Sequence, residues 1–323
     1  MLTIGILGAA GIAPGAVIRP ARRRDDTVIG AVASRSAETA RTYAQVHGIP
    51  RSYGSYEELL ADASIDLVYV ALPPSEHARW TIAALEAGKD VLCEKPIAMN
   101  ATEAAEMVAA AERTGHRLIE AFHDRYHPLS RHIDEVVASG RLGAIRNLRA
   151  DFLVSIPFDP ASIRHVPELG GGALMDLGCY PVHWIRALTG EEPTVVSATG
   201  TPNPLGVDMI IEAHLVFPSG ITAVVTASMA AETNSNSLLI EGELGTLEID
   251  NPVFPSAGHS IIETVDGIDR ISTVAGLMTY DHQLEAVVRA LASGEPTLTE
   301  GADIIANATV IDAIYAAAGF PTR

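Results

Sequence analysis

The sequence LTIGILGAAGIAPGAVI, residues 2–18, decides the fold, because a short apolar strand runs directly into a glycine-rich turn. In a strand–turn–helix unit that binds a dinucleotide, the first glycine allows a tight turn and the second small residue lets the backbone approach the diphosphate. A third small residue lets helix and strand pack closely. Here these positions are Gly8, Ala10 and Ala13, and Gly11 and Ile12 complete the turn. The following helix is expected to offer N–H groups and a positive dipole end to phosphates.

The same rhythm continues through the first 120 residues. Apolar strand-like segments recur at 28–33, 66–72, 90–93 and 118–122, with helix-like segments between them. In one of these helices, Asn100 is a predicted cap, with Glu103 placed to reach back to it, and Gly115 is the predicted end. Apolar strands that alternate with helices predict a parallel sheet covered on both faces, and right-handed crossovers make it doubly wound. The fold class predicted for this half is therefore α/β, a Rossmann domain over residues 1–122.

After residue 123 the strand-like segments are longer and their connections shorter. They lie at 145–156, 207–217, 221–229, 237–241 and 245–250. Short connections favour antiparallel neighbours. Residues 123–323 are therefore predicted to form an α+β domain with a large, mainly antiparallel open sheet. The last helical pattern, 301–318, is a candidate to pack back on the first domain.

Composition excludes several classes of partner. Acidic residues outnumber basic ones 40 to 22, which gives a net charge of −18. Such a surface repels nucleic acid and anionic membranes. Cys93 and Cys179 cannot build a disulfide framework, and neither they nor the eleven histidines show a metal-ligand spacing, so no metal is expected. Basic residues follow the first apolar run instead of preceding it, which is unlike a signal peptide. We expect a cytoplasmic protein without a spanning helix.

The end of the second strand bears on cofactor choice. A site for NAD usually places an acid there, to hold the ribose 2′-hydroxyl. This sequence instead has Ser34 and Arg35, and a guanidinium fork suits a 2′-phosphate. The pair favours NADP over NAD. The alternative is that Arg35 is a solvated surface residue and both cofactors are accepted.

Two further motifs carry candidate chemistry. Lys95, in the Glu94-Lys95-Pro96 turn, follows a buried strand on the edge where doubly wound sheets bind ligands. Residues 170–183 read GGGALMDLGCYPVH, and a helix from Ala173 would place Asp176, Tyr180 and His183 on one face. Because Pro181 interrupts helical hydrogen bonding, that helix is either kinked there or begins near Tyr180.

The strand–turn–helix start, the Glu94-Lys95-Pro96 turn and the GGGALMDLGCY stretch together resemble the glucose–fructose oxidoreductase/inositol dehydrogenase (Gfo/Idh/MocA) family, over essentially the whole chain. Tyrosine at 180 is more similar to its dimeric dihydrodiol dehydrogenase and NADP-xylose dehydrogenase branch. The resemblance implies NAD(P)-dependent hydride transfer at the CH–OH group of a sugar, polyol or trans-diol. It also implies that residues 123–323 form the domain for substrate binding and oligomerisation, in a homodimer or homotetramer.

The resemblance further implies roles for individual residues. Tyr180 would be the general acid/base, Lys95 would hydrogen-bond the same substrate oxygen, and Asp176 would orient the substrate or Lys95. Around the cofactor, it adds Leu72, Pro73, Pro74, His77, Glu94, Lys95 and Arg125 to the glycine-rich turn and to Ser34 and Arg35. Arg164 and His183 join Lys95, Asp176 and Tyr180 around the substrate.

The sequence departs from the family pattern at three positions. Pro74 stands where many members have asparagine, which removes one polar cofactor contact. His123 and Asp124 stand where relatives have more apolar or aromatic residues. They are either a substrate-specificity feature or a solvated loop pair, and we favour the solvated pair.

Two other functions remain compatible with the motifs. An NAD-dependent glycosidase of the same fold would share most of the site and consume no cofactor overall. A non-catalytic, dinucleotide-sensing regulator would be expected to lose the lysine or the acid/base residue, whereas Lys95, Asp176 and Tyr180 are all present. This favours catalysis.

Overall fold

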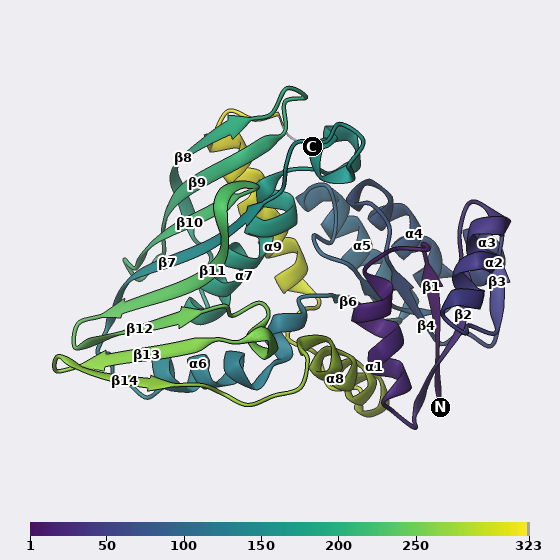
Figure 1. Ribbon diagram of the computed structural model, residues 1–323, viewed down its shortest axis with the longest axis horizontal. Coiled ribbons are helices and arrows are strands. Elements are labelled where there is room, and N and C mark those ends of the chain that lie inside the picture. The colour runs from purple at the N-terminus through teal and green to yellow at the C-terminus, as the bar shows by residue number, and fades with distance from the viewer. Residues whose placement is uncertain (322–323) are drawn as a thin grey trace. The chain divides into compact units, whose positions relative to one another are not determined.

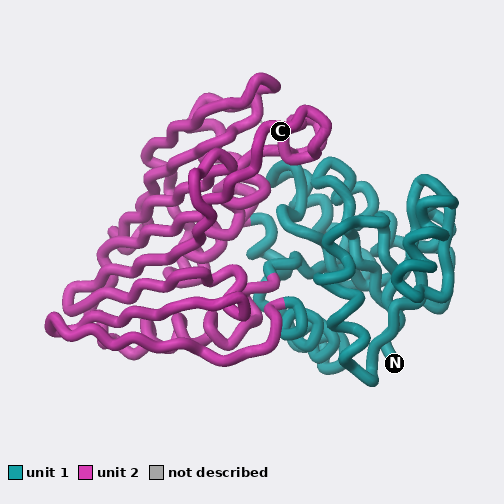
Figure 2. The backbone as a smooth tube through the Cα atoms, viewed as in Figure 1, with its two compact units in different colours: residues 1–122, 280–305 teal, residues 123–279, 306–323 magenta. Residues whose placement is uncertain are grey.

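The computed structural model describes residues 1–321 and divides into two compact units, which Figure 2 shows in different colours. The first unit comprises residues 1–122 and 280–305, and the second comprises residues 123–279 together with those from 306 onward. The chain therefore leaves the first unit at Phe122 and returns to it for a segment of 26 residues, counted from 280 to 305.

The first unit contains a six-stranded parallel sheet with the order β3-β2-β1-β4-β5-β6 (Figure 1). Its strands are β1 (Leu2–Leu7), β2 (Thr27–Ala33), β3 (Arg51–Tyr53), β4 (Leu67–Val70), β5 (Asp90–Cys93) and β6 (Leu118–Glu120). Its helices are η1 (Pro14–Ile18), α1 (Arg19–Arg22), α2 (Ala37–Val46), α3 (Tyr56–Leu60), α4 (Pro74–Glu86), α5 (Ala101–Thr114) and α8 (Thr279–Ser293). This confirms the doubly wound Rossmann prediction, and the strand order reverses at β1, where such sheets bind ligands.

Helix ends in this unit follow local sequence signals. The Asn100 side chain accepts a hydrogen bond from the Glu103 backbone N–H at 3.0 Å, and the Glu103 carboxylate accepts one from the Met99 N–H at 3.0 Å. Gly115, with φ of 72°, ends α5 in the left-handed region that favours glycine. The sequence predicted these boundaries because capping depends on neighbours only.

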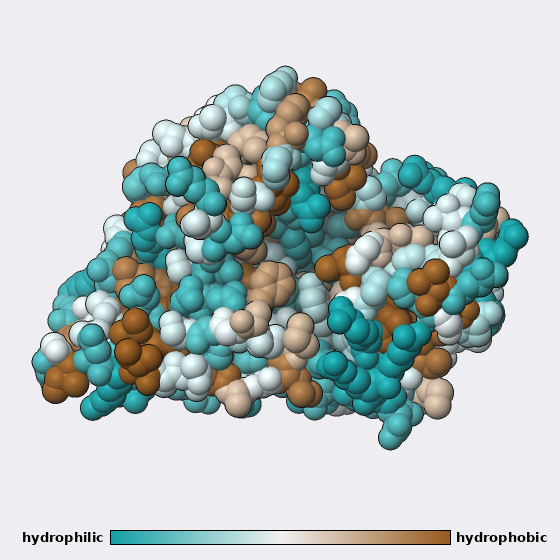
Figure 3. All heavy atoms as spheres, in the orientation of Figure 1, coloured by the Kyte–Doolittle hydropathy of each residue, from teal (hydrophilic) through white to brown (hydrophobic). Residues whose placement is uncertain are grey.

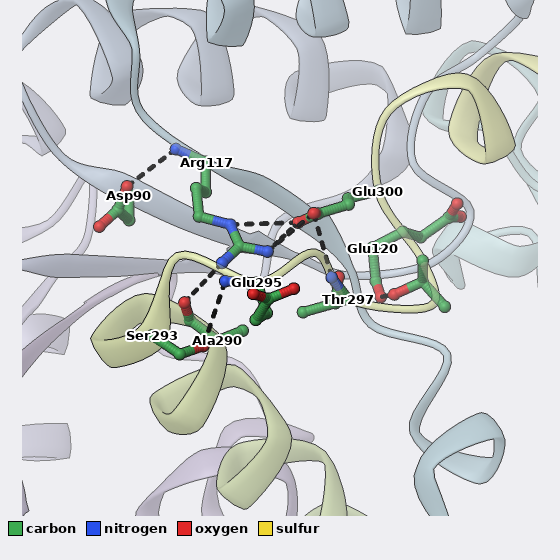
Figure 4. A network of polar contacts seen from close by, with 9 residues as sticks. Asp90, Arg117, Glu120, Ala290, Ser293, Glu295, Thr297 and Glu300 are labelled. Carbon is green, nitrogen blue, oxygen red and sulfur yellow. Dashed lines mark hydrogen bonds and ion pairs between the residues drawn. The ribbon is translucent and has the colours of Figure 1, made fainter.

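The returning segment is fastened to the first unit by apolar packing and by a polar network. Leu284 and Val287 of α8 are buried in the same core cluster as Ile4 and Ile6 of β1. Figure 4 shows the polar part, in which the Arg117 guanidinium donates to both oxygens of Glu300, at 2.7 and 2.6 Å, and to the Ala290 carbonyl at 2.7 Å. Arg117 lies far from Ala290 and Glu300 in the sequence, so local sequence patterns did not predict that these residues would pair.

The second unit contains an eight-stranded sheet with the order β14-β13-β12-β11-β7-β10-β9-β8 (Figure 1). Its strands are β7 (Ile145–Ser155), β8 (Thr194–Pro202), β9 (Asp208–Val216), β10 (Thr222–Ser228), β11 (Ala230–Gly242), β12 (Gly245–Asp250), β13 (Ser260–Val265) and β14 (Ile268–Ser272). All neighbours are antiparallel except β7 and β10. The mainly antiparallel prediction is confirmed.

One face of this sheet is covered. On β7 the residues Leu148, Ala150 and Phe152 are buried, whereas the alternate residue Arg149 is exposed. Helix α7 (Cys179–Thr189) packs on β7 and β10. The unit also contains α6 (Pro128–Ala138) and α9 (Ala302–Ala317), most of which belongs to it. The alternation along β7 is the period of two expected of a half-buried strand.

The far end of the same sheet is exposed and partly apolar. Ile268 and Ile271 of β14 are 64% and 74% exposed, and Figure 3 shows apolar atoms at this end of the sheet. Every residue of β14 is exposed. The sequence prediction omitted β8, β13 and β14 and shortened β11. β8 and β14 are mostly exposed and β13 is mostly half-buried, so these strands lack the long apolar runs on which that prediction depended.

Candidate functional site

The glycine-rich turn links β1 to η1 in the first unit. Gly8 has φ of 102°, and a Cβ there would lie 2.5 Å from the Ala71 carbonyl oxygen, so only glycine fits. Gly11 is exposed, with nothing within 4 Å of where its Cβ would be, and Ala13 is buried in the core. The turn therefore presents open backbone above a small, packed residue, an arrangement that fits a diphosphate.

The helix after the turn differs in detail from the expectation. It begins with Pro14, which has no N–H, and its first turn is π-helical before α1 continues it. Proline is common at the first helical position, where its N–H would be unpaired in any case. Tyr43 of α2 donates a hydrogen bond to the Ala10 carbonyl at 2.9 Å, and partial burial raises the pKa of Tyr43 to about 12. The phenol is therefore a fixed neutral donor that holds the turn.

Among the residues after β2, the two serine side chains are hydrogen-bonded, whereas the arginine between them is exposed. The Ser36 side chain caps α2 by accepting from the Thr39 N–H at 3.2 Å, and the Ser34 hydroxyl accepts from the Ser36 N–H at 3.4 Å. Arg35 is exposed and forms no ion pair with any of residues 1–321. Its guanidinium is thus available to an anionic ligand near the switch point of the sheet.

The loops after β4 and β5 are held by a buried histidine. The ring nitrogens of His77 lie 2.8 Å from the Leu72 carbonyl oxygen and 2.9 Å from that of Pro96. Burial lowers the pKa of His77, so the ring is neutral and donates its single N–H to one of these carbonyls. Pro73 and Pro74, which begin α4, are half-buried. His77 therefore ties the two loops together beneath their surface.

Lys95 lies on a loop that is braced from two sides. Glu94, the residue before it, accepts a hydrogen bond from the buried Tyr69 hydroxyl, and burial raises the pKa of Tyr69. On the other side, the Glu120 carboxylate accepts from the Ile97 N–H at 2.9 Å, although Glu120 is buried. Lys95 itself is half-buried. The sequence signal for this brace is an acid inside the apolar segment 118–122, which is rare unless it is paired.

In the second unit, the glycine run permits a close backbone contact. A Cβ on Gly171 would lie 2.6 Å from the carbonyl carbon and oxygen of Arg164, and the Gly172 N–H donates to that oxygen at 2.9 Å. The Arg164 side chain then donates to Asp176 at 2.7 Å. The glycines therefore bring the predicted substrate residue Arg164 onto the predicted catalytic residue Asp176.

The helix after the glycine run resolves the alternative posed by Pro181. Residues 174–178 form a π-helical turn, η5 (Leu174–Gly178), and α7 begins at Cys179. The first N–H of η5, from Leu174, donates at 2.7 Å to the buried carboxylate of Asp208, whose other oxygen accepts from Tyr315 at 2.8 Å. Asp208 thus anchors the start of this helix, and the sequence reasoning missed it.

Tyr180 is packed among aromatic rings, and its hydroxyl has a buried histidine beside it. It is 3% exposed, and its hydroxyl is 3.1 Å from Nε2 of His123, which is 2% exposed. The Phe152 ring packs edge-on at 5.7 Å between centroids. Because both side chains are almost fully buried, the hydrogen bond between phenol and imidazole is stronger than it would be in water.

The interpretation of His123 and Asp124 as a solvated loop pair is wrong. Asp124 is 5% exposed, and its carboxylate accepts from Trp184 Nε1 at 2.7 Å. Burial raises the pKa of Asp124, while the Trp184 hydrogen bond and the charge of the buried His183 lower it by less. Both residues are buried because the turn that carries them, η2 (His123–Tyr126), packs on α7, some 60 residues further along the chain.

Arg125, predicted to contact the cofactor, is engaged within the second unit. Its guanidinium donates to Ser130 and, at 2.7 Å, to Asp134 of α6. His127 begins α6 by accepting from the Leu129 N–H at 3.1 Å. These contacts fix η2 to α6.

Two features that the described residues lack bear on other functions. Within residues 1–321, no helix is both long and apolar enough to cross a membrane. In the same residues, no group of three or more histidine, cysteine or acidic side chains is arranged to hold a metal ion. Cys93 and Cys179 are both buried, as expected of small apolar residues.

Comparison with known proteins agrees with the fold described above. Residues 2–122 match the oxidoreductase family with an NAD-binding Rossmann fold, and residues 130–248 match the GFO/IDH/MocA C-terminal domain. A D-xylose 1-dehydrogenase (NADP(+)) of Haloferax volcanii is 37% identical over 320 residues, covering 98% of this chain and 97% of the relative. A trans-1,2-dihydrobenzene-1,2-diol dehydrogenase of Xenopus laevis is 37% identical over 238 residues, covering 73% and 71%.

Among solved structures, a 3-ketoreductase from Actinomadura kijaniata, in complex with NADP and TDP-benzene, superposes with a TM-score of 0.91. It is 27% identical and covers 98% of this chain and 97% of its own. The Rossmann unit and these matches define an NAD(P)-dependent oxidoreductase. The chain belongs to the Gfo/Idh/MocA family.

Proposed function

We propose that the protein transfers a hydride between NADP and a secondary alcohol, ketone or hemiacetal carbon of a sugar, polyol or trans-diol. The observation that carries the proposal is the buried hydroxyl of Tyr180, 3.1 Å from an imidazole nitrogen, on α7, which directly follows the π-helical turn that carries Asp176. A proton-exchanging group of this kind is what oxidation of an alcohol requires beside the cofactor. The relatives named as D-xylose and trans-diol dehydrogenases support the substrate class.

Tyr180 is assigned as the general acid/base. In oxidation it accepts the proton of the substrate hydroxyl, and in reduction it donates that proton to the carbonyl oxygen. Lys95 is assigned to the same substrate oxygen, where its charge favours the alkoxide and the phenolate. Both assignments also draw on the family resemblance of these two positions.

Asp176 and its neighbours are assigned to substrate orientation. Nε of Arg164 lies 2.7 Å from one carboxylate oxygen of Asp176, and this ion pair fixes the position of the carboxylate. An anchored carboxylate holds a sugar hydroxyl in a defined direction, which lowers the entropy cost of reaching the reactive geometry. His183, buried on α7, is assigned to the wall of the substrate pocket.

The residues present on the first unit fit the cofactor. The Gly8–Ala13 turn would hold the diphosphate, Ser34 and Arg35 the 2′-phosphate of NADP, and Leu72, Pro73, Pro74, Glu94 and Lys95 the remainder of the dinucleotide. His77 would act by fixing the loops that carry these residues. Nicotinamide, when bound, accepts or donates the hydride. The exposed Arg35, with no described acidic partner, supports NADP over NAD.

A small-molecule partner and self-association complete the proposal. The exposed isoleucines of β14 support a homodimer or homotetramer through the second unit, because apolar exposure of this kind is typical of protein interfaces. Size-exclusion chromatography with light scattering would return a dimer or tetramer mass. A monomer mass would remove this part of the proposal.

The experiment that tests the function begins with titration of the purified protein with NADPH and NADH, followed by nicotinamide fluorescence. Protein with bound cofactor removed is then incubated with NADP⁺ and either D-xylose or trans-1,2-dihydrobenzene-1,2-diol. Accumulation of NADPH supports the proposal. Release of a sugar from a glycoside without net NADPH would identify the glycosidase, and cofactor binding without turnover of any sugar or diol would identify the regulator.

A further inference from the structure

We propose that His123 is a positioning residue that acts through Tyr180: it takes up the tyrosine proton during alcohol oxidation and returns it during reduction. The proposal rests on the assignment of Tyr180 as acid/base and deepens it. His123 stands at a position where the resemblance led us to expect a more apolar residue, so the role belongs to this chain's own sequence.

The geometry of the pair allows proton transfer in both directions. Nε2 of His123 lies 3.1 Å from the Tyr180 oxygen, and the rings meet edge-on, 5.7 Å apart. With Nε2 unprotonated, the phenol donates its single hydrogen to it, and the phenol oxygen keeps lone pairs for the substrate hydroxyl. With Nε2 protonated, the imidazole donates to the phenol oxygen, which leaves the phenol hydrogen for a substrate carbonyl. The two protonation states are thus the starting points of the two reaction directions.

The turn that carries His123 is fixed on both sides. Asp124 accepts from Trp184, which lies four residues after Tyr180 on α7, at 2.7 Å. Arg125 donates to Asp134 of α6 at 2.7 Å. A side chain held between two anchored neighbours keeps its rotamer, so little reorganisation accompanies the proton transfer.

Apolar rings limit water around the pair. The Phe254 ring lies 5.6 Å from the His123 ring, and the Phe152 ring lies 5.7 Å from that of Tyr180. Both members of the pair are almost fully buried. Because bulk water has poor access to the phenol, the phenol proton passes more readily to an adjacent acceptor than to solvent.

The step balances without a further reactant. In oxidation the carbinol C–H bond breaks and its hydride passes to nicotinamide. The substrate O–H bond breaks and its proton binds the Tyr180 oxygen, while the phenol O–H breaks and that proton binds Nε2 of His123. The products are a carbonyl compound, reduced cofactor and an imidazolium, which loses its proton to solvent between turnovers. Reduction reverses each step.

The elements that carry the pair also carry titratable and charged groups, which bear on its pH dependence. On its own turn His123 adjoins Asp124 and Arg125, and the charge of Arg125 is balanced by Asp134. On α7 the neighbours are Tyr180 and His183, and one turn earlier stands Asp176, paired with Arg164. The packed rings of Phe152 and Phe254 add no charge. The decisive readout is therefore a pH profile.

The test uses full-length protein with saturating NADP⁺, and D-xylose and trans-1,2-dihydrobenzene-1,2-diol as probes. His123→Gln keeps a hydrogen-bonding side chain that cannot take up a proton, and His132→Gln on α6 is the matched control. We expect kcat/KM of His123→Gln to fall about 10–100-fold near pH 7 and to recover toward pH 10, roughly where a phenol ionises by itself. KM and NADPH affinity should stay near wild type. An equal loss at every pH, or a rise in KM alone, would overturn the proposal.

A second measurement needs no substrate. Isotope-labelled histidine is followed by NMR through a pH titration, and the His123 signal is assigned by its absence from His123→Gln. We expect Tyr180→Phe to shift the nitrogen resonances and the midpoint of His123 while leaving His132 unchanged. An unchanged His123 would overturn the proposal. If wild type oxidises neither probe, the substrate class fails, and the His123–Tyr180 pair is still decided by this measurement.

Discussion

Arginine side chains that look alike in the sequence have different surroundings in the structure. Arg164 is paired with Asp176 and Arg125 with Asp134, both at 2.7 Å. Arg35 is exposed after β2 and forms no ion pair with the described residues. Of these three arginines, Arg35 alone has no acidic partner among the described residues, so its replacement gives a direct prediction about cofactor choice.

Arg35→Ala is expected to weaken NADPH binding by about tenfold or more, because one charge-assisted hydrogen bond contributes about 1.5–3 kcal/mol. NADH affinity should change little, since NADH has no 2′-phosphate. Fluorescence titration with both cofactors measures the difference. Arg113→Ala, which removes a surface arginine paired with Glu86 on the same unit, is the matched control. Equal weakening of NADPH and NADH would show that Arg35 does not contact the 2′-phosphate.

Asp124 gives a prediction about pH and stability. Burial raises the pKa of Asp124, so the folded protein holds this proton more tightly than the unfolded chain does. The stability contributed by the group is therefore present at acid pH and lost as the pH rises through the raised folded-state pKa. Asp124→Asn keeps an acceptor for Trp184 and has no charge to lose.

We expect the Tm of Asp124→Asn to equal that of wild type below pH 3.8, the ordinary value for aspartate, and to exceed it by a few degrees near pH 7. Thermal unfolding across this range measures the difference. The exposed Asp25→Asn is the control, with no expected pH-dependent difference. A variant less stable than wild type at every pH would contradict the account of Asp124.

At the scale of residues, the sequence predicted features that depend on neighbours in the chain and missed those that depend on distant residues. The glycine-rich turn and the Asn100 cap depend on adjacent residues, and both were predicted from them. The burial of His123 and Asp124 depends on Tyr180 and Trp184, which are 57 and 60 residues away in the chain. Two polar residues beside Phe122 gave no local sign that a helix would cover them.

At the scale of elements, segments with a strong apolar pattern of their own were predicted, whereas segments that depend on distant parts of the chain were not. Continuous apolar strands such as β4 and β5 were evident, because both of their faces are buried. The exposed β14 was not, nor was the return of residues 280–305 to the first unit. That return depends on side chains, among them Leu284, that meet the core only in the folded chain.

The Arg117 network gives a prediction about how α8 is held against the rest of the first unit. Arg117→Ala removes the bidentate bond to Glu300 and the bond to the Ala290 carbonyl. With the partners only 18–19% exposed, we expect a loss of roughly 2–3 kcal/mol in the free energy of unfolding, against little change for Arg113→Ala. Hydrogen exchange should accelerate in β6 and α8 and stay unchanged in β11. Uniform acceleration in all three would show that Arg117 does not act as a local fastening.

At the scale of the whole molecule, each of the two units carries some of the residues assigned to the proposed reaction. The first carries the glycine-rich turn, Arg35 and Lys95, and the second carries Asp176 and Tyr180. With a net charge of −18, the protein repels an anionic cofactor at long range, so binding must depend on local donors in the first unit. A change to the acid/base residue in the second unit should then alter chemistry without altering cofactor affinity.

The most direct test compares wild type with Tyr180→Phe as whole chains, for NADPH affinity and for NADP⁺ reduction by D-xylose and by trans-1,2-dihydrobenzene-1,2-diol. Tyr53→Phe, which removes a hydroxyl bonded to Asp62 in the first unit, is the matched control. The account predicts turnover by wild type and by the control, a kcat lower by about 10²–10⁴-fold in Tyr180→Phe, and the same NADPH affinity in all three. Full activity of Tyr180→Phe would contradict the account.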